Sequence, residues 1–308
     1  MHQTLPIFEY PITTVFIDDD AIFLQTIKAA LGNHHTRTFS NPEDFITFFT
    51  VYKKTLLKNK FLHGEKKHED YDLLEHAPVE FDVTTIAAIH EQDSRFHEIG
   101  VIVCDYSMPT LTGLELFKQI HDAPIKKMLL TGEIQTDETV DAFNEGLINK
   151  YIPKRSPDLI MDIETSLRKL TRQYFSEQTS ALLSHLEVDY PLPLSDPIFI
   201  AFFDNWCKEH HIKEFYLIDK QGSFMLIDKN NKVHYLVVHS DRSLDKFAEI
   251  YLSNPEAKAL KEMVVKRKKI PFFGYAKEAR HFDAKEWKKY FYSLKVLKGK
   301  EKYYWTVV

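Results

Sequence analysis

The first half of the chain alternates short apolar segments with amphipathic ones, and this alternation is the strongest constraint on the fold. The segments between the apolar runs place apolar residues three or four positions apart, as a helix with one buried face does. The apolar segments are expected to be strands, at residues 13–18, 36–39, 100–105, 126–131 and 149–152. Repeated strand–helix units build a parallel sheet with helices on both faces. The sequence therefore predicts a doubly wound α/β domain over residues 1–155.

One section interrupts this rhythm. Residues 52–96 are highly charged and contain one stretch, 82–92, that we expect to be helical. The section falls between the second predicted helix and the third predicted strand, so we interpret it as an insertion that leaves the sheet unchanged. Within it, residues 58–70 are expected to be partly mobile.

A long helix is predicted to leave this first domain near Ser156. Its apolar stripe could serve as core or as a dimer seam, and we favour the seam for its later turns. The stripe consists of Ile160, Ile163, Leu167, Leu170 and Tyr174. Residues 189–197 are rich in proline and mark a linker, so residues 156–197 are interpreted as helix and linker.

Residues 198–308 are predicted to form an α+β domain with an antiparallel sheet. After a helix over 196–212, three short strands separated by tight turns indicate consecutive hairpins, at 214–219, 223–228 and 232–240. A broken helical segment and further strands complete the expected domain. Cys207, His210 and His211 lie close together there, but their spacing fits no common zinc site.

Composition limits the location and partners of the chain. It has no run of roughly 18 apolar residues, so no transmembrane helix is expected. The first residues lack the pattern of a signal peptide. The two cysteines are far apart and suggest no disulfide framework. These features favour a cytoplasmic protein with no membrane partner.

The charge is unevenly distributed. The formal net charge is -5, yet residues 255–308 hold 15 Lys and Arg against 6 Asp and Glu. Such a segment indicates an acidic partner or, more often, a solvated face. Aromatic residues mixed with the basic ones keep a nucleic-acid surface open as an alternative. Residues 198–308 nevertheless lack the helix-turn-helix pattern of many DNA-binding domains.

The most distinctive polar residues follow the predicted strands. Asp18 and Asp19 end the first strand and Asp105 ends the third, and close carboxylates repel one another unless a cation neutralises them. The carboxyl ends of parallel strands meet at one edge of the sheet, so these acids should form an oxygen-rich pocket suited to Mg²⁺. Asp20 differs, because it precedes a helix that its side chain can cap.

Two more strand ends carry residues that can contact an anion. The fourth strand ends at Thr131, and the fifth runs into Lys154. A cation site, a nucleophilic carboxylate, a lysine and a hydroxyl are the parts needed to transfer a phosphoryl group to an aspartate. The alternative is a cluster of acids that takes no phosphate.

With the motifs FIDDD, VIVCDYSMPTLTGLEL, MLLTG and YIPK in this order, residues 13–155 resemble the receiver domain of two-component response regulators. The resemblance implies a CheY-like sheet of strand order 2-1-3-4-5 and transfer of a phosphoryl group from a histidine kinase. By this match Asp105 is the phosphoacceptor, and Asp18, Asp19, Asp105 and the backbone carbonyl of Ser107 hold Mg²⁺.

The same resemblance assigns the remaining site residues. Thr131 would hydrogen-bond the phosphoryl group, Lys154 would pair with it, and Tyr151 matches the aromatic switch position. The insertion at 52–96 is a departure from the family.

The resemblance further implies a signalling protein that is no enzyme beyond its own aspartyl phosphorylation and dephosphorylation. Its partners would be a sensor histidine kinase and a second copy, joined through the receiver face and the long helix. A receiver followed by an unclassified α+β output domain is also similar to a quorum-sensing response regulator. Two alternatives stay open: a transcription regulator that binds DNA through its basic C-terminal region, and an output enzyme gated by the receiver.

Overall fold

A computed structural model describes residues 4–32, 35–59, 83–121, 123–132, 137–183, 193–252, 257–274 and 284–308. Most of the expected mobile stretch, 58–70, lies outside these residues. The chain forms two compact units. We call Pro11–Val79 with Ser94–Tyr174 the N-terminal unit, and Met1–Tyr10, Glu80–Asp93 and Phe175–Val308 the C-terminal unit. The predicted boundaries differ, since they count residues 1–10 and 80–93 with the first domain.

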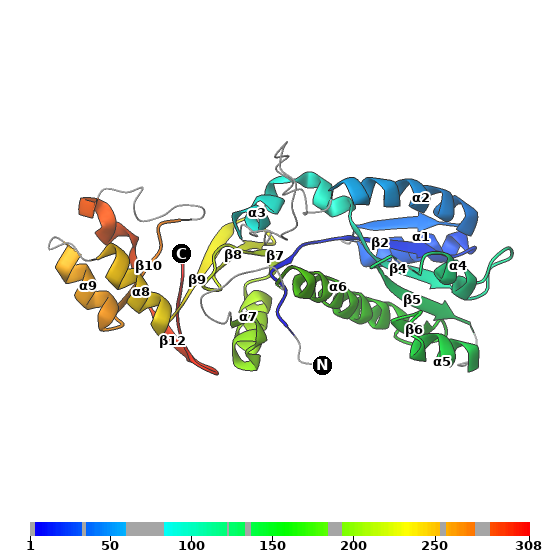
Figure 1. The fold of residues 1–308 in the computed structure, drawn as a ribbon. Coiled ribbons are helices and arrows are strands. Elements are labelled where there is room, and N and C mark those ends of the chain that lie inside the picture. The colour runs from blue at the N-terminus through cyan, green and yellow to red at the C-terminus, as the bar shows by residue number, and fades with distance from the viewer. Residues whose placement is uncertain are drawn as a thin grey trace, which may run out of the picture. The chain divides into compact units, whose positions relative to one another are not determined.

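The N-terminal unit is built on a five-stranded parallel sheet of order β3-β2-β4-β5-β6, shown in Figure 1. Its strands are β2 (Thr13–Ile17), β3 (Thr36–Phe39), β4 (Ile99–Asp105), β5 (Lys126–Thr131) and β6 (Lys150–Pro153). Counted along the chain, the order is 2-1-3-4-5, as the resemblance implies. Every residue of β4 is buried, because this central strand is covered on both faces.

Among the described residues, five α-helices cover the two faces of this sheet: α1 (Ala21–Leu31), α2 (Pro42–Asn59), α4 (Gly113–Gln119), α5 (Asp137–Asn144) and α6 (Leu159–Leu183). Alternate strand residues point to opposite faces. Val15 and Ile102 pack in one core with residues of α2, α4 and α5, whereas Phe16 and Val103 pack in the other with α1 and α6. The predicted doubly wound arrangement is therefore confirmed.

The long helix α6 begins at Leu159 and its apolar stripe is part of the core. Ile163, Leu167 and Leu170 pack against the sheet, and each is at most 5% exposed. Tyr174 is also buried. The dimer-seam interpretation of these residues is wrong, because the sheet face next to α1 would otherwise be left open to water.

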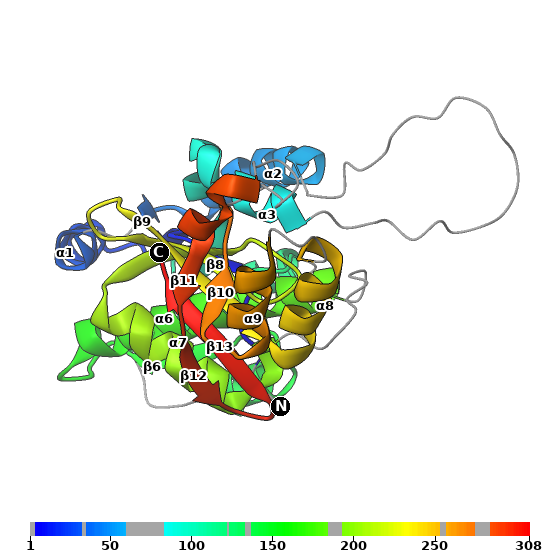
Figure 2. The ribbon, with the colours of Figure 1, turned by 90° about the vertical axis from the view of Figure 1, so that its left-hand side faces the viewer.

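The C-terminal unit contains a six-stranded antiparallel sheet of order β1-β7-β8-β9-β13-β12 and a two-stranded sheet, β10-β11 (Figure 2). The strands are β1 (Phe8–Glu9), β7 (Ile212–Leu217), β8 (Phe224–Asp228), β9 (Val233–Ser240), β10 (Lys269–Pro271), β11 (Phe291–Ser293), β12 (Lys295–Lys298) and β13 (Lys302–Val307). The three predicted hairpin strands are β7, β8 and β9. The α+β prediction is confirmed.

The α-helices of this unit include α3 (Val83–Ala88), α7 (Pro197–Glu209), α8 (Asp241–Tyr251) and α9 (Lys258–Val265). Short 3-10 turns are η1 (Ile89–Glu91), η3 (Pro193–Ser195) and η6 (Ala284–Tyr290), while η2 (Asp93–His97) lies at the boundary between the units. The helix expected over 82–92 is thus present as α3 and η1. No helix among the described residues is both long and apolar enough to span a bilayer.

The N-terminal residues join this unit through an edge strand that the sequence did not reveal. Phe8 and Glu9 pair with Tyr216 and Phe215 of β7. The rings of Phe8 and Tyr10 lie 5.6 and 4.9 Å from the ring of Phe175. Burial of these aromatic rings explains why residues before β2 belong to the C-terminal unit.

Candidate functional site

The ends of β2, β4 and β6 bring the predicted polar residues together. Asp18 follows β2 directly, Asp105 is the last residue of β4, and Lys154 follows β6. The register pairs Ile17 with Cys104, so Asp18 and Asp105 occupy equivalent positions on neighbouring strands. Parallel strands end at the same edge of a sheet, and this edge therefore carries the candidate site.

Lys154 bridges two buried carboxylates. Its Nζ lies 2.7 Å from Oδ2 of Asp18 and 2.8 Å from Oδ1 of Asp105. The side chains of both acids are at most 6% exposed, whereas that of Lys154 is 23% exposed. The ring of Phe23, on α1, lies 5.0 Å from the same ammonium group. The lysine is thus held between two acids and one aromatic ring.

Asp19 completes the acidic group. Asp18, Asp19 and Asp105 each offer a carboxylate oxygen, and these oxygens all lie within 4.8 Å of one another. Asp18 is buried, while Asp19 is exposed to solvent. An arrangement of three hard oxygen ligands with one open side can hold a divalent cation.

The electrostatics of the pocket follow from burial. Burial raises the pKa of the Asp18 carboxyl above its usual value, and the Asp105 charge adds to this; the Lys154 contact and the Asp20 amide oppose it only in part. Burial by itself lowers the pKa of Lys154, but the contacts with Asp105 and Asp18 outweigh it, so the pKa is raised. The Lys154 side chain is therefore protonated and positively charged.

Asp20 caps α1, as the sequence predicted. Its Oδ1 accepts hydrogen bonds from the backbone N–H groups of Ile22 and Phe23, at 2.9 and 3.0 Å. Its own N–H donates to Oδ1 of Asp18 over 3.0 Å. The backbone at the start of α1 therefore fixes one oxygen of Asp18, and the other faces Lys154.

Thr131, Ser107 and Tyr151 lie on the elements that carry the site. Thr131 is the buried last residue of β5, and Ser107 is exposed, two positions after Asp105. Tyr151, on β6, is half-buried against the hydrophobic core, with its ring 6.2 Å from that of Phe143. Thr131 and Ser107 therefore lie at this edge, whereas Tyr151 lies two residues before the end of β6.

The loop after Asp105 folds back onto its own strand. The N–H of Gly113 donates to the carbonyl of Tyr106 over 3.0 Å. A Cβ at Gly113 would lie 2.3 Å from the backbone oxygen of Asp105 and 2.8 Å from Cδ1 of Leu129. Only glycine allows this approach, so Gly113 supports the position of Asp105. Thr112 and Glu115 form a capping box that starts α4 at the same point.

Comparison with known proteins identifies the fold. No family model matches the chain. The chain is similar to the structure of the Legionella pneumophila response regulator LqsR, with a TM-score of 0.79 and 28% identity, covering 100% of this chain and 90% of that one. The N-terminal unit has the fold of response regulator receiver domains.

A second similarity concerns only part of the chain. The hydrogenase transcriptional regulatory protein HoxA of Cupriavidus necator is 31% identical over 88 residues. The match covers 27% of this chain and 18% of HoxA. The matched segment is therefore less than a fifth of the length of HoxA. The similarity to LqsR, by contrast, extends beyond the N-terminal unit into the C-terminal unit.

Sequence reasoning missed the part that Phe23 plays at this site. It was treated only as part of an amphipathic helix, although it lies one turn after the acidic run. Gly113 was not missed, because the resemblance to receiver domains places it in the turn after Asp105. The structure adds the close packing that requires glycine at this position.

Proposed function

We propose that the chain is a two-component response regulator that accepts a phosphoryl group on Asp105 and passes the change to its C-terminal unit. The supporting observation is the ion-paired group at the sheet edge, in which Lys154 contacts both Asp18 and Asp105. Buried acids at the ends of adjacent strands, with a lysine between them, have the charges that phosphoryl transfer needs. The proposed donor is the phosphohistidine of a sensor histidine kinase.

In this proposal the two carboxylate oxygens of Asp105 have different roles. Because Oδ1 lies against Lys154, we propose that Oδ2 attacks phosphorus. The new P–O bond of the aspartyl phosphate forms as the P–N bond to the kinase imidazole breaks, and the imidazole leaves with the electron pair. Lys154 orients the acceptor and offsets the negative charge that gathers on the phosphoryl oxygens.

The residues present fit Mg²⁺. Asp18, Asp19, Asp105 and the carbonyl of Ser107 would hold it, and Oδ2 of Asp18 is a buried oxygen with no hydrogen bond among the described residues, its partner being the Lys154 ammonium. When bound, the ion supplies positive charge that draws together the acids and the phosphoryl oxygens. Lys154 and the neighbouring strand ends hold Asp105 in place.

Phosphorylation would act as an electrostatic switch. It adds roughly -1.5 to -2 charges at Asp105. In our proposal the Thr131 hydroxyl moves toward the new oxygens, and the ring of Tyr151 turns further inward from its half-buried position beside Phe143. That change would bias the face formed by α5, β6 and the start of α6, and so promote or break contacts with a second copy or another protein.

The first experiment measures labelling by a small phosphodonor. The purified chain should take up phosphate from acetyl phosphate in the presence of Mg²⁺, and Asp105→Asn should abolish the labelling. Asp20→Asn is the matched control, because it removes the same charge at a neighbouring residue whose side chain caps α1. Its labelling should remain within about twofold of the wild type. Mg²⁺-dependent labelling of Asp105→Asn would overturn the assignment.

A second experiment tests transmission. Light-scattering mass is measured with and without beryllofluoride, which mimics the phosphoryl group, in the wild type and in Tyr151→Ala. A change of mass in the wild type that is lost in the variant supports homodimer control through this face. An unchanged mass would restrict the output to contacts with other proteins.

A cytoplasmic location and a role in quorum sensing are part of the proposal and rest on the family resemblance.

A further inference from the structure

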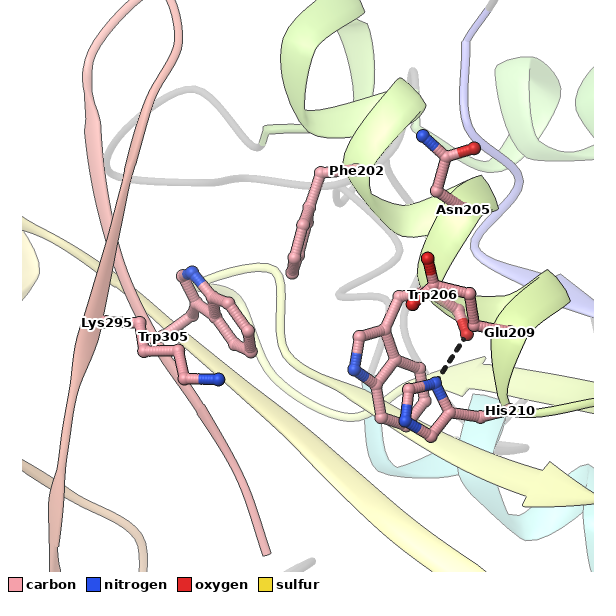
Figure 3. Close-up of a pocket in the computed structure, with 7 residues that line it drawn as sticks. All are labelled: Phe202, Asn205, Trp206, Glu209, His210, Lys295 and Trp305. Carbon is pink, nitrogen blue, oxygen red and sulfur yellow. Dashed lines mark hydrogen bonds between the residues drawn. The ribbon is translucent and has the colours of Figure 1, made fainter.

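The C-terminal unit has an open pocket of about 380 Å³ between α7 and the hairpin of β12 and β13 (Figure 3). Its aromatic lining comes from Phe202 and Trp206 of α7 and Trp305 of β13, and its charged lining from Glu209 and Lys295. Pockets that bind small molecules are lined mostly by apolar and aromatic groups with a few polar ones. The volume is at the small end of their usual range of about 300–1,000 Å³.

One wall is rigid. The indole of Trp206 stacks on the imidazole of His210, with ring centroids 3.9 Å apart and an angle of 11° between the planes. The Nδ1–H of His210 donates to the carbonyl of Trp206 over 2.9 Å, the dashed line in Figure 3. The histidine therefore fixes the indole, whose flat face is ready to receive a ligand at little cost in conformational entropy.

The opposite wall is formed across two elements. The rings of Phe202 and Trp305 lie 4.6 Å apart. Lys295 is the cross-strand partner of Trp305, and its Nζ lies 4.9 Å from the centre of that indole. The pocket is thus enclosed by aromatic rings on both sides, with an ammonium group over one of them (Figure 3).

These rings are not ordinary core residues. Phe199 and Phe203, on the inner side of α7, are fully buried, whereas Phe202, Trp206 and Trp305 keep part of their surface open to solvent. Two of the three tryptophans of the chain line this one pocket. Leaving large rings partly exposed forgoes the stability that their burial would give, which suggests a role in binding.

The two charges of the lining lie on different elements. In Figure 3 the Glu209 carboxylate and the Lys295 ammonium face the gap from opposite walls. Neither forms an ion pair with a described residue: Lys295 contacts only the Trp305 ring, and Glu209 has no described partner. Both charges can therefore pair with a ligand, and a ligand with two opposite charges would satisfy both.

We propose that this pocket binds a small aromatic zwitterion, a molecule with one flat ring, one acidic group and one amino group. The ring would stack between Trp206 and the Phe202–Trp305 pair, the acid would meet Lys295, and the amine would meet Glu209. A plain cation is disfavoured because Lys295 already covers the Trp305 face, where a cation would bind. A plain anion is disfavoured by Glu209. The proposal goes beyond the receiver function and needs no phosphorylation.

The test uses simple probes and the full chain. L-phenylalanine carries both charges, 3-phenylpropionate lacks the amine, 2-phenylethylamine lacks the acid, and L-valine lacks the ring. Binding is followed by calorimetry and by the fluorescence of Trp206 and Trp305. We expect saturable binding of L-phenylalanine, with the two single-charge probes weaker by about two- to fivefold, as for exposed ion pairs. L-valine should not bind.

Variants test which lining residue binds each charged group of the ligand. In Lys295→Met, 2-phenylethylamine and L-phenylalanine should bind with equal affinity. In Glu209→Gln, 3-phenylpropionate and L-phenylalanine should bind with equal affinity. Trp206→Leu should lower the affinity about fivefold, given that aromatic stacking contributes about 1 kcal/mol beyond burial. Lys298→Met is the matched control, since Lys298 lies on the same strand and is exposed but does not line the pocket. Circular dichroism and melting temperature verify that each variant folds.

Two results would overturn the proposal. The absence of saturable binding for all four probes at millimolar concentration would show that the pocket is not a site for such ligands. Equal affinity for L-phenylalanine and both single-charge probes, unchanged in Lys295→Met and Glu209→Gln, would reject the zwitterion. Neither result depends on labelling of Asp105, so failure here is distinguishable from failure of the proposed function.

Discussion

Substituting Asp18 by asparagine should stabilise the protein in the absence of Mg²⁺. Asp18 is 1% exposed, and its carboxylate faces Lys154 at 2.7 Å together with oxygens of Asp19 and Asp105 within 4.8 Å. At an effective dielectric constant of about 20, the attraction is about 6 kcal/mol and each repulsion about 3–4 kcal/mol, the one from exposed Asp19 being screened further. These contributions nearly cancel, which leaves the cost of burying the charge.

The expected gain is about 2 kcal/mol, because burying a charge without full compensation costs several kcal/mol and structural relaxation recovers part of it. For a domain of this size that corresponds to an increase of about 4–8 °C in melting temperature. The amide oxygen of asparagine can still accept the N–H of Asp20, which donates to Oδ1 of Asp18 over 3.0 Å. The cap of α1 therefore stays in place.

The pH dependence has a definite sign. Burial raises the folded-state pKa of Asp18 above its usual value of 3.8. Protonation of Asp18 therefore favours the folded state. This contribution to the free energy of unfolding is fully present below the usual pKa and is lost as the pH rises through the folded-state pKa. The advantage of Asp18→Asn over the wild type should consequently be largest at neutral pH and shrink as the pH falls toward 4.

The assay is thermal unfolding in EDTA and in increasing Mg²⁺. Mg²⁺ at about a hundred times its dissociation constant should stabilise the wild type by about 2.7 kcal/mol, and Asp18→Asn far less because it lacks one ligand. Asp20→Asn is the control, since it removes a favourable charge at a helix N-terminus and should lower stability by about 0.3–1 kcal/mol. A wild type that is more stable than Asp18→Asn in EDTA at pH 7 would refute this reasoning.

Three further predictions concern other parts of the chain. Gly113→Ala should slow labelling of Asp105 by acetyl phosphate and lower the melting temperature, because the added Cβ would lie 2.3 Å from the Asp105 backbone oxygen. Asp196→Ala should destabilise the C-terminal unit by about 1–3 kcal/mol in chemical denaturation, since Asp196 caps α7 and accepts the Tyr303 hydroxyl at 2.9 Å. If residues 255–308 bind DNA, the affinity measured by fluorescence anisotropy should fall steeply with salt concentration; a flat response would argue against the DNA-binding alternative.

The sequence predicts the receiver sheet and its pocket well because both depend on local patterns. The central strands of the parallel sheet are short apolar runs, and a polar site residue lies at or directly after the strand end: Asp18 follows β2, Asp105 ends β4 and Thr131 ends β5. Strand order fixes which ends are neighbours. The exact contacts were beyond sequence, since the bridging position of Lys154 and the ring of Phe23 beside it depend on how α1 and β6 pack.

The incorrect interpretation of α6 has a different physical cause. Helical periodicity shows that Ile163, Leu167 and Leu170 share one face, but it does not show what covers that face. The same stripe would suit a second copy or the sheet of its own chain, and the sheet covers it here. Strand β1 was missed for a related reason, since two residues, Phe8 and Glu9, carry no alternation that marks a strand.

The aromatic pocket was the least predictable feature because it depends on contacts between distant segments. The spacing of Trp206 and His210 places both on one face of α7, which the sequence does show. That Lys295 lies opposite Trp305 depends on the register of the β12–β13 hairpin, and that the hairpin meets α7 depends on the order of the whole six-stranded sheet. Lys295 and Trp305 lie about ninety residues or more after Trp206 in the sequence. Residues so far apart leave no local pattern, so a site of this kind can be recognised only when the sheet order is known.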